Sequence, residues 1–291
     1  MMFSFSPNLR GICWMVIAMA AFAVEDALIK RVAHELPIGQ VLMLFGLCGA
    51  SVFAVLAGRQ GVRLRHADVA SRPMLVRAVF ELLGRLFYGL AIVLTPMSAA
   101  TAILQATPVL VVLGGSLYFG ERVGWQRWCA VVAGLVGVLI VLRPSAASFS
   151  GLSLLAVVGM IGFAGRDLAS RAASRALSTL HLGFYGFLTI VLAGGLYALW
   201  DGRGFGLPGG AAAACLGAAV GVGVFAYTAL MHAMRTGDIA TVTPFRYSRL
   251  LFGIGLGVGL FDERVDAPMM LGCAIIVGAG VLIAWQGRRR G

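Results

Sequence analysis

Residues Phe22–Asp26 read Phe-Ala-Val-Glu-Asp, and the related string Phe-Ala-Gly-Arg-Asp follows at Phe163–Asp167. The string Glu-Arg-Val likewise occurs at Glu121–Val123 and again at Glu263–Val265. A third string, Gly-Val-Leu-Ile, is also found twice, in the same order and at nearly the same offset. Three matches in chain order at nearly one offset indicate an internal repeat. The chain therefore reads as two copies of one structural unit.

Each copy contains five apolar runs of about the length that crosses a membrane. A helix needs about 20 apolar residues to span ~30 Å of hydrocarbon. The breaks between runs are mostly short and carry turn residues such as proline, glycine and aspartate. We therefore predict an all-α integral membrane protein of ten helices, with five in residues 1–145 and five in residues 146–291. The predicted helices are Leu9–Val32, Ile38–Ala57, Met74–Leu94, Ser98–Phe119, Gln126–Leu142, Gly151–Ala172, Leu180–Trp200, Gly210–Met234, Ile239–Leu260 and Ala267–Trp285.

The composition also indicates a membrane protein. The chain has 60% hydrophobic residues, 12% charged residues and a mean hydropathy of +0.93, whereas soluble domains carry roughly 25% charged residues. The net charge of +11 comes mostly from basic residues in the gaps between apolar runs, so we expect the lipid bilayer as a partner and no nucleic acid. The five cysteines lie inside apolar runs and form no metal-binding pattern, so we expect no metal and no cofactor.

The placement of basic residues predicts the orientation. Thirteen of the 23 Lys and Arg residues lie near the two chain ends or in the connections after the second, fourth, sixth and eighth helices. Five lie in the other connections, and cytoplasmic loops are the ones enriched in Lys and Arg. We therefore expect both termini in the cytoplasm. Because each unit has an odd number of helices, the second unit must then be inverted, as in many secondary transporters.

The paired Phe-Ala-x-x-Asp strings, the Glu-Arg-Val turns and the ten apolar runs resemble the EamA-type family of the drug/metabolite transporter superfamily. Within it, the chain looks most similar to bacterial exporters of aromatic amino acids, the YddG type. The resemblance implies one transport domain with a basket-like bundle of ten helices, located in the bacterial inner membrane. It also implies export without an ATP-binding module, and the sequence contains no P-loop pattern.

Polar residues near the middle of the predicted helices are candidates for substrate binding. Charges at this depth are unfavourable unless they face the protein interior or a wet cavity. An arginine can hold the carboxylate of an amino acid, an acidic residue can hold its ammonium group, and tyrosines can pack against its side chain. The alternative is that Glu81 and Arg85 only neutralise each other, one turn apart. The candidates are Glu81, Arg85, Tyr88, Gln105, Tyr227, Arg246, Tyr247 and Arg249.

One acidic residue, Glu81, opposes three arginines in this set, so we expect an excess of two positive charges at the midplane. Asp26 and Asp167 occupy mirror-related positions, each closer to one of the two membrane surfaces. They are candidates for gates or for proton coupling, together with Lys30 and Arg171 four residues further along their helices. The alternative is that each aspartate forms an ordinary ion pair with that neighbouring cation.

We predict a secondary transporter that exports small amphipathic solutes, with aromatic and other neutral amino acids as the leading class, by alternating access around a central cavity. The alternatives are export of other metabolites or drug-like organic cations, or a channel-like facilitator. We do not expect an enzyme, because the sequence contains neither HExxH nor GxSxG. A monomer is compatible with the sequence, which leaves the oligomeric state and the energy coupling open.

Overall fold

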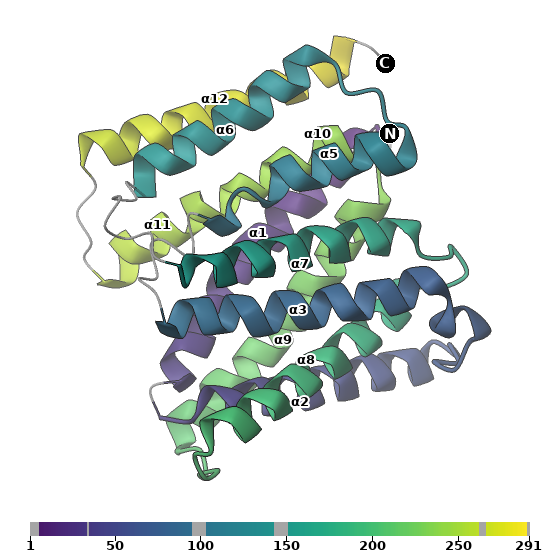
Figure 1. Ribbon diagram of the computed structural model, residues 1–291, viewed down its shortest axis with the longest axis vertical. Coiled ribbons are helices and arrows are strands. Elements are labelled where there is room, and N and C mark those ends of the chain that lie inside the picture. The colour runs from purple at the N-terminus through teal and green to yellow at the C-terminus, as the bar shows by residue number, and fades with distance from the viewer. Residues whose placement is uncertain (1–5, 34, 95–102, 143–150, 262–265, 290–291) are drawn as a thin grey trace.

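The computed structural model describes residues 6–33, 35–94, 103–142, 151–261 and 266–289, and these residues form helices and connections without a strand. The helices run roughly alongside one another, and α1 starts at the end of the bundle where α12 finishes (Figure 1). Their bounds are α1 (Pro7–Ala33), α2 (Ile38–Arg59), η1 (Ala67–Ala70), α3 (Arg72–Leu94), α5 (Thr107–Phe119), α6 (Trp125–Leu142), α7 (Ser153–Ala172), α8 (Thr179–Asp201), α9 (Gly210–Arg235), α10 (Ile239–Val242), η3 (Thr243–Tyr247), α11 (Ser248–Phe261) and α12 (Ala267–Arg289).

Two of the ten predicted helices are interrupted, so their prediction as continuous helices was wrong. The fourth was predicted over Ser98–Phe119, of which residues 98–102 lie outside the described residues, and a turn at 105–106 precedes α5. The ninth is divided into α10, the 3₁₀ segment η3 and α11. A proline lies in the first turn after each break, Pro108 in α5 and Pro244 in η3. Proline has no N–H to donate inside a helix, but it is tolerated in a first turn.

The two units interlock. The four most extensive helix contacts pair α3 with α7, α1 with α9, α2 with α8, and α6 with α12, and each pair joins the first unit to the second. Figure 1 shows α6 and α12 together at the top of the bundle, and α2 and α8 together at the bottom. The main hydrophobic core accordingly draws residues from both units, such as Phe45 and Phe187. Neither unit buries its apolar surface alone.

Glycines allow the paired backbones to approach closely. A Cβ atom on Gly162 of α7 would overlap the backbone of Gly84 in α3, and one on Gly159 would lie 2.8 Å from the Tyr88 nitrogen. At the α2–α8 crossing, a Cβ atom on Gly194 would lie 2.7 Å from the Met43 nitrogen. Small residues that bring helix backbones together are typical of helix packing in membranes.

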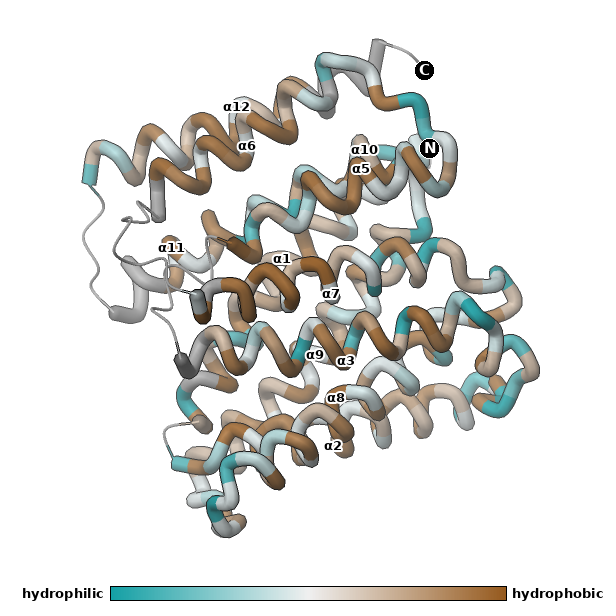
Figure 2. The backbone as a smooth tube through the Cα atoms, viewed as in Figure 1, coloured by the Kyte–Doolittle hydropathy of each residue, from teal (hydrophilic) through white to brown (hydrophobic). Residues whose placement is uncertain are grey.

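The outer surface suits lipid. Figure 2 shows hydrophobic residues along the helices and hydrophilic residues gathered at many connections. Among the described residues, α1, α2, α8 and α9 are long and apolar enough to span a membrane by length and composition. α3 and α7 contain charged residues that face inward, such as Glu81 and Asp167, which lowers their hydropathy. The chain is therefore a multi-pass membrane protein in which the charged residues of α3 and α7 face the interior, while apolar residues of the same helices, such as Leu75 and Ile161, face outward.

Substituting Gly162 with alanine is expected to lower the thermal unfolding midpoint in detergent, because the new methyl group meets the Gly84 backbone. Overpacking of this kind costs about 1–3 kcal/mol. The matched control is Gly195→Ala in α8, where an added Cβ atom meets nothing within 4 Å. Replacing glycine with alanine in an open helical position usually stabilises. Equal midpoints for the two variants would contradict the close crossing.

Candidate functional site

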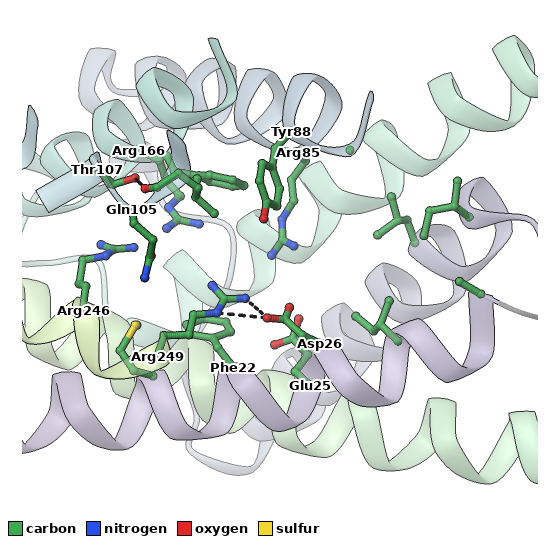
Figure 3. A pocket seen from close by; sticks show the side chains of 18 of the residues that line it. Phe22, Glu25, Asp26, Arg85, Tyr88, Gln105, Thr107, Arg166, Arg246 and Arg249 are labelled. Carbon is green, nitrogen blue, oxygen red and sulfur yellow. Dashed lines mark hydrogen bonds and ion pairs between the residues drawn. The ribbon is translucent and has the colours of Figure 1, made fainter. Parts of the chain in front are cut away.

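A cavity of about 410 Å³ lies between α1, α3, α7 and the two interrupted helices. Figure 3 shows that its polar side chains come from opposite sides: Arg85 from α3, Asp26 from α1, and Arg246 and Arg249 from the η3–α11 segment. Gln105, in the turn before α5, extends toward the space between the latter two arginines (Figure 3). The predicted site residues that line the cavity are Asp26, Arg85, Tyr88, Gln105, Arg246 and Arg249.

Glu81 lies behind this lining, where its side chain has no solvent exposure. Its carboxylate accepts hydrogen bonds from Arg166 Nη1 at 3.1 Å and from the Tyr227 hydroxyl at 2.9 Å. Arg77 Nη2 lies 3.5 Å from the same carboxylate and Arg85 Nε lies 3.8 Å away. Burying a carboxylate is unfavourable unless it is paired and hydrogen-bonded, and these neighbours supply both. Glu81 is therefore engaged by protein groups instead of facing the cavity.

Arg77 is held on every side. Besides approaching Glu81, it donates hydrogen bonds to Ser170 Oγ and to the Leu182 carbonyl, both at 3.0 Å, and to the Tyr227 hydroxyl. Tyr227 thus serves as a link between Arg77 and Glu81. The other predicted binding tyrosine, Tyr247, is also buried, and its hydroxyl donates to the Val131 carbonyl at 3.1 Å. Neither tyrosine is among the residues that line the cavity.

The expected excess of two positive charges was wrong, because it left out acidic residues from other helices. Arg246 pairs with Asp167, which also accepts two contacts from Arg166 at 2.9 Å. Arg249 pairs with Asp26 (Figure 3). Within the described part of the chain, six arginines and five carboxylates line the cavity or pair with each other around it, which leaves a single formal positive charge. The arginines are Arg77, Arg85, Arg166, Arg203, Arg246 and Arg249, and the carboxylates are Glu25, Asp26, Glu81, Asp167 and Asp201.

The structure does not show the alternative expected for Asp167, an ion pair with Arg171 on the same helix. Asp167 forms an ion pair with Arg246, while Arg171 Nη2 lies 3.1 Å from Glu121 Oε1. Arg171 also donates to the carbonyls of Met234 and Gly237, so it connects α7 to the connection between α9 and α10. The side chain of Lys30 lies outside the described residues, and Asp26 is paired with Arg249.

Sequence reasoning missed Glu25 and Arg166, which both line the cavity. The repeat itself held the signal. Glu25 is the fourth residue of the string at 22–26, and Arg166 is the fourth residue of the string at 163–167. The two residues therefore occupy equivalent positions in the two units. Phe22 and Phe163, the first residues of the same strings, also line the cavity.

The aromatic rings of these strings lie against arginines. The Arg166 guanidinium carbon lies 5.0 Å from the centre of the Phe163 ring, and that of Arg85 lies 5.9 Å from it. Arg249 is 5.4 Å from the centre of the Phe22 ring. Tyr88 meets Phe163 edge to face, with 5.9 Å between ring centres. Cation–π contacts of this kind hold a guanidinium while leaving its N–H groups available.

Two cavity-lining charges are incompletely satisfied within the described part of the chain. Glu25 is 3% exposed, and its Oε2 atom has no hydrogen-bond partner there. Arg85 Nε is buried without a hydrogen bond, since Glu81 is too far for one. Figure 3 shows the two side chains on facing walls of the cavity. An unsatisfied acid opposite an unsatisfied cation can receive a solute that carries both charges. Among the described residues, no group of three His, Cys, Asp or Glu side chains could hold a metal ion.

Comparison with known proteins consistently matches the chain to small-molecule transporters. Two stretches of the chain, residues 9–143 and 151–285, each match the EamA-like transporter family. The chain is also similar to a solved crystal structure at a TM-score of 0.80, with 22% sequence identity and coverage of 97% of this chain and 98% of the other. At that identity, the likeness shows the fold alone.

Several curated proteins are similar over nearly their whole length. The chain is 29% identical to the pseudopaline exporter CntI of Pseudomonas aeruginosa, covering 94% of this chain and 95% of the relative. It is 27% identical to a riboflavin transporter of Rhizobium johnstonii, with 96% and 92% covered. It is 22% identical to an S-adenosylmethionine uptake transporter of Rickettsia prowazekii, with 97% and 94% covered. These relatives are named for different solutes and for both directions of transport.

Replacing Glu81 with glutamine is expected to destabilise the protein severely, because Arg77 and Arg166 would remain buried without their shared counterion. Removing one partner from a buried ion pair costs about 3–5 kcal/mol. The matched control is Asp201→Asn, which breaks the exposed pair with Arg203 and should change stability by less than about 1 kcal/mol. Thermal unfolding in detergent measures both. A Glu81→Gln variant as stable as Asp201→Asn would rule out the described network.

Proposed function

Because the chain belongs to the EamA-like transporter family, we propose that it exports small amphipathic solutes with the paired charges of an amino acid, by alternating access around the central cavity. Its membership confirms the resemblance to the EamA-type family and the expectation of a small-molecule transporter instead of an enzyme. The observation that carries the proposal is the pair of unsatisfied charges, Glu25 and Arg85, on facing walls of one cavity.

In this proposal, the residues that bind the solute's charges differ from those expected from the sequence. Glu81 was the expected partner for an ammonium group, but Arg77, Arg166 and Tyr227 already occupy its oxygens. Glu25 takes that place in the proposal, because its Oε2 atom is free of described partners. Arg85 binds the carboxylate, and its guanidinium suits a two-point contact with a carboxylate.

The rest of the solute would lie against the aromatic residues of the cavity. Phe22, Tyr88 and Phe163 line it together with apolar residues such as Met19 and Leu42. A volume of about 410 Å³ falls within the ~300–1,000 Å³ of small-molecule sites. Aromatic and other neutral amino acids remain the leading class. An organic cation without a carboxylate fits the described arginines less well, since they outnumber the carboxylates.

The topology proposed from the sequence has structural support. The start of α1 and the end of α12 share one end of the bundle, as ten helices with an inverted second unit require (Figure 1). The two family matches, residues 9–143 and 151–285, fall within the proposed units 1–145 and 146–291. The basic connections after α2 and α7 favour the cytoplasm for that end. We place the protein in a bacterial inner membrane, acting as a monomer.

The interrupted ninth helix is the proposed gating element. It holds Arg246 and Arg249, which pair with the two aspartates proposed as gates, Asp167 on α7 and Asp26 on α1. Movement of this segment would therefore break or re-form its ion pairs with both units. The contact between Arg171 and Glu121 joins α7 to the end of α5 and supports closure at the end of the bundle where α1 begins.

Transport of labelled phenylalanine into proteoliposomes tests the binding site. Glu25→Gln and Arg85→Gln are each expected to lower uptake by about tenfold or more, because a charge-assisted hydrogen bond contributes about 1.5–3 kcal/mol. The matched controls are Glu35→Gln and Arg31→Gln, which make the same chemical changes at exposed positions near the end of α1. These controls should keep the wild-type rate.

Three outcomes decide the assignment. Wild-type uptake by both cavity variants would refute the assigned site. Uptake of other solutes but no amino acid by the wild-type protein would refute the substrate class. Uptake that does not saturate and is not accelerated by solute on the opposite side would favour a channel-like facilitator.

Cysteine labelling tests the inversion. Arg63 and Gly204 lie at equivalent positions of the two units, in the exposed connections after α2 and α8. In a background without the five native cysteines, Gly204→Cys should react with a membrane-impermeant maleimide on intact cells. Arg63→Cys should react only after the membrane is permeabilised. Labelling of both from the same side would contradict an inverted second unit.

A further inference from the structure

A second hollow lies outside the central cavity, on the flank of the bundle where α3 packs beside α8. Its volume is about 730 Å³, and we call it the α3–α8 groove. One end of the groove is bordered by the basic α2–α3 connection, which contains the 3₁₀ segment η1. The residues that define it are Arg65, His66, Leu75, Tyr185, Leu188 and Leu192.

The groove wall is mostly apolar, although Arg77 and Thr189 also line it. Leu75 is 57% exposed, Leu188 is 37% exposed and Leu192 is 54% exposed, although all three lie on helices inside a membrane protein. From Thr179 to Leu192, α8 rises about 20 Å at 1.5 Å per residue. Half of the hydrocarbon core measures ~15 Å. The groove therefore reaches from the region of η1 to about the depth at which an acyl chain ends.

The polar end of the groove is positively charged. Arg65 and His66 line it, Arg63 lies in the same connection, and Arg72 begins α3. Among the described residues, Arg65 has no ion-pair partner, and the acid nearest to it in sequence, Asp68, lies 3.9 Å from His66. A free guanidinium above an apolar groove complements a ligand with an anionic head and an apolar tail.

Two side chains of α8 hold this end in place. His181 Nε2 lies 3.1 Å from the Arg63 carbonyl, and the Tyr185 hydroxyl donates to the Leu64 carbonyl at 3.3 Å. The ring of His66 also meets that of His181 edge to face, with 6.1 Å between their centres. The backbone next to Arg65 is thus fixed against the same helix that forms the groove wall, and the basic end and apolar wall form one preorganised surface.

We propose that the α3–α8 groove binds one anionic phospholipid, with an acyl chain along Leu188 and Leu192 and the headgroup phosphate on Arg65. A basic residue near a membrane surface attracts an anionic lipid by about 1 kcal/mol, or about fivefold in affinity. A phosphatidylcholine headgroup brings its own cation toward Arg65, so it binds more weakly. The site is separate from the solute cavity.

Native mass spectrometry of the full-length protein in detergent tests the proposal, with dioleoyl phosphatidylglycerol, dioleoyl phosphatidylcholine or inorganic phosphate added. The wild-type protein should retain one phosphatidylglycerol in preference to phosphatidylcholine. Arg65→Gln should weaken that retention about fivefold. The matched control is Arg122→Gln, which removes an exposed charge from the α5–α6 connection and should leave retention unchanged.

The apolar part has its own variant. Leu188→Trp fills the groove and should lower retention, whereas Leu199→Trp, at an 83% exposed position of α8 outside the groove, should not. The proposal is overturned by equal retention of the two lipids, or by an equal effect of each variant and its control. Displacement of the lipid by inorganic phosphate would also overturn it, because the groove would then be a site for free anions.

Discussion

The structure depends on how one buried carboxylate is neutralised inside a membrane. Glu81 has no solvent exposure, and water is absent from the hydrocarbon around the bundle. An isolated charge there would lose its hydration without compensation. The compensation comes from Arg77 on its own helix, Arg166 on α7 and the Tyr227 hydroxyl on α9. The groups that make Glu81 tolerable are thus supplied by both halves of the chain.

This requirement orders the rest of the site. Arg166 binds both Glu81 and Asp167, and Asp167 in turn binds Arg246. Charge neutralisation therefore runs from the middle of α3 to the interrupted ninth helix. Glu25 and Arg85 remain at the edge of this arrangement, facing the cavity with unused hydrogen-bonding capacity. The binding capacity that we assign to the cavity is what the network leaves unsatisfied.

The sequence predicts local properties well and partners poorly. Apolar length located eight helices directly, and depth along a helix identified Arg85, Tyr88 and Gln105 as cavity residues. The sequence did not predict that Glu81 would be enclosed. Its partners Arg166 and Tyr227 come from other helices, and the apolar pattern of a helix does not show which helices pack against it. Tyr247 was misplaced for a related reason. It ends a 3₁₀ segment, which has about three residues per turn, so a helical estimate of its direction fails.

The glycines at the crossings of α3 with α7 and α2 with α8 have an evolutionary consequence. The close crossings require glycine at a few positions. They do not restrict the side chains at most other positions. The surface that meets lipid demands little more than apolar character. The fold can therefore persist through extensive divergence, as the TM-score of 0.80 at 22% identity illustrates. Within such a tolerant scaffold, the cavity lining can vary while the helix crossings stay fixed.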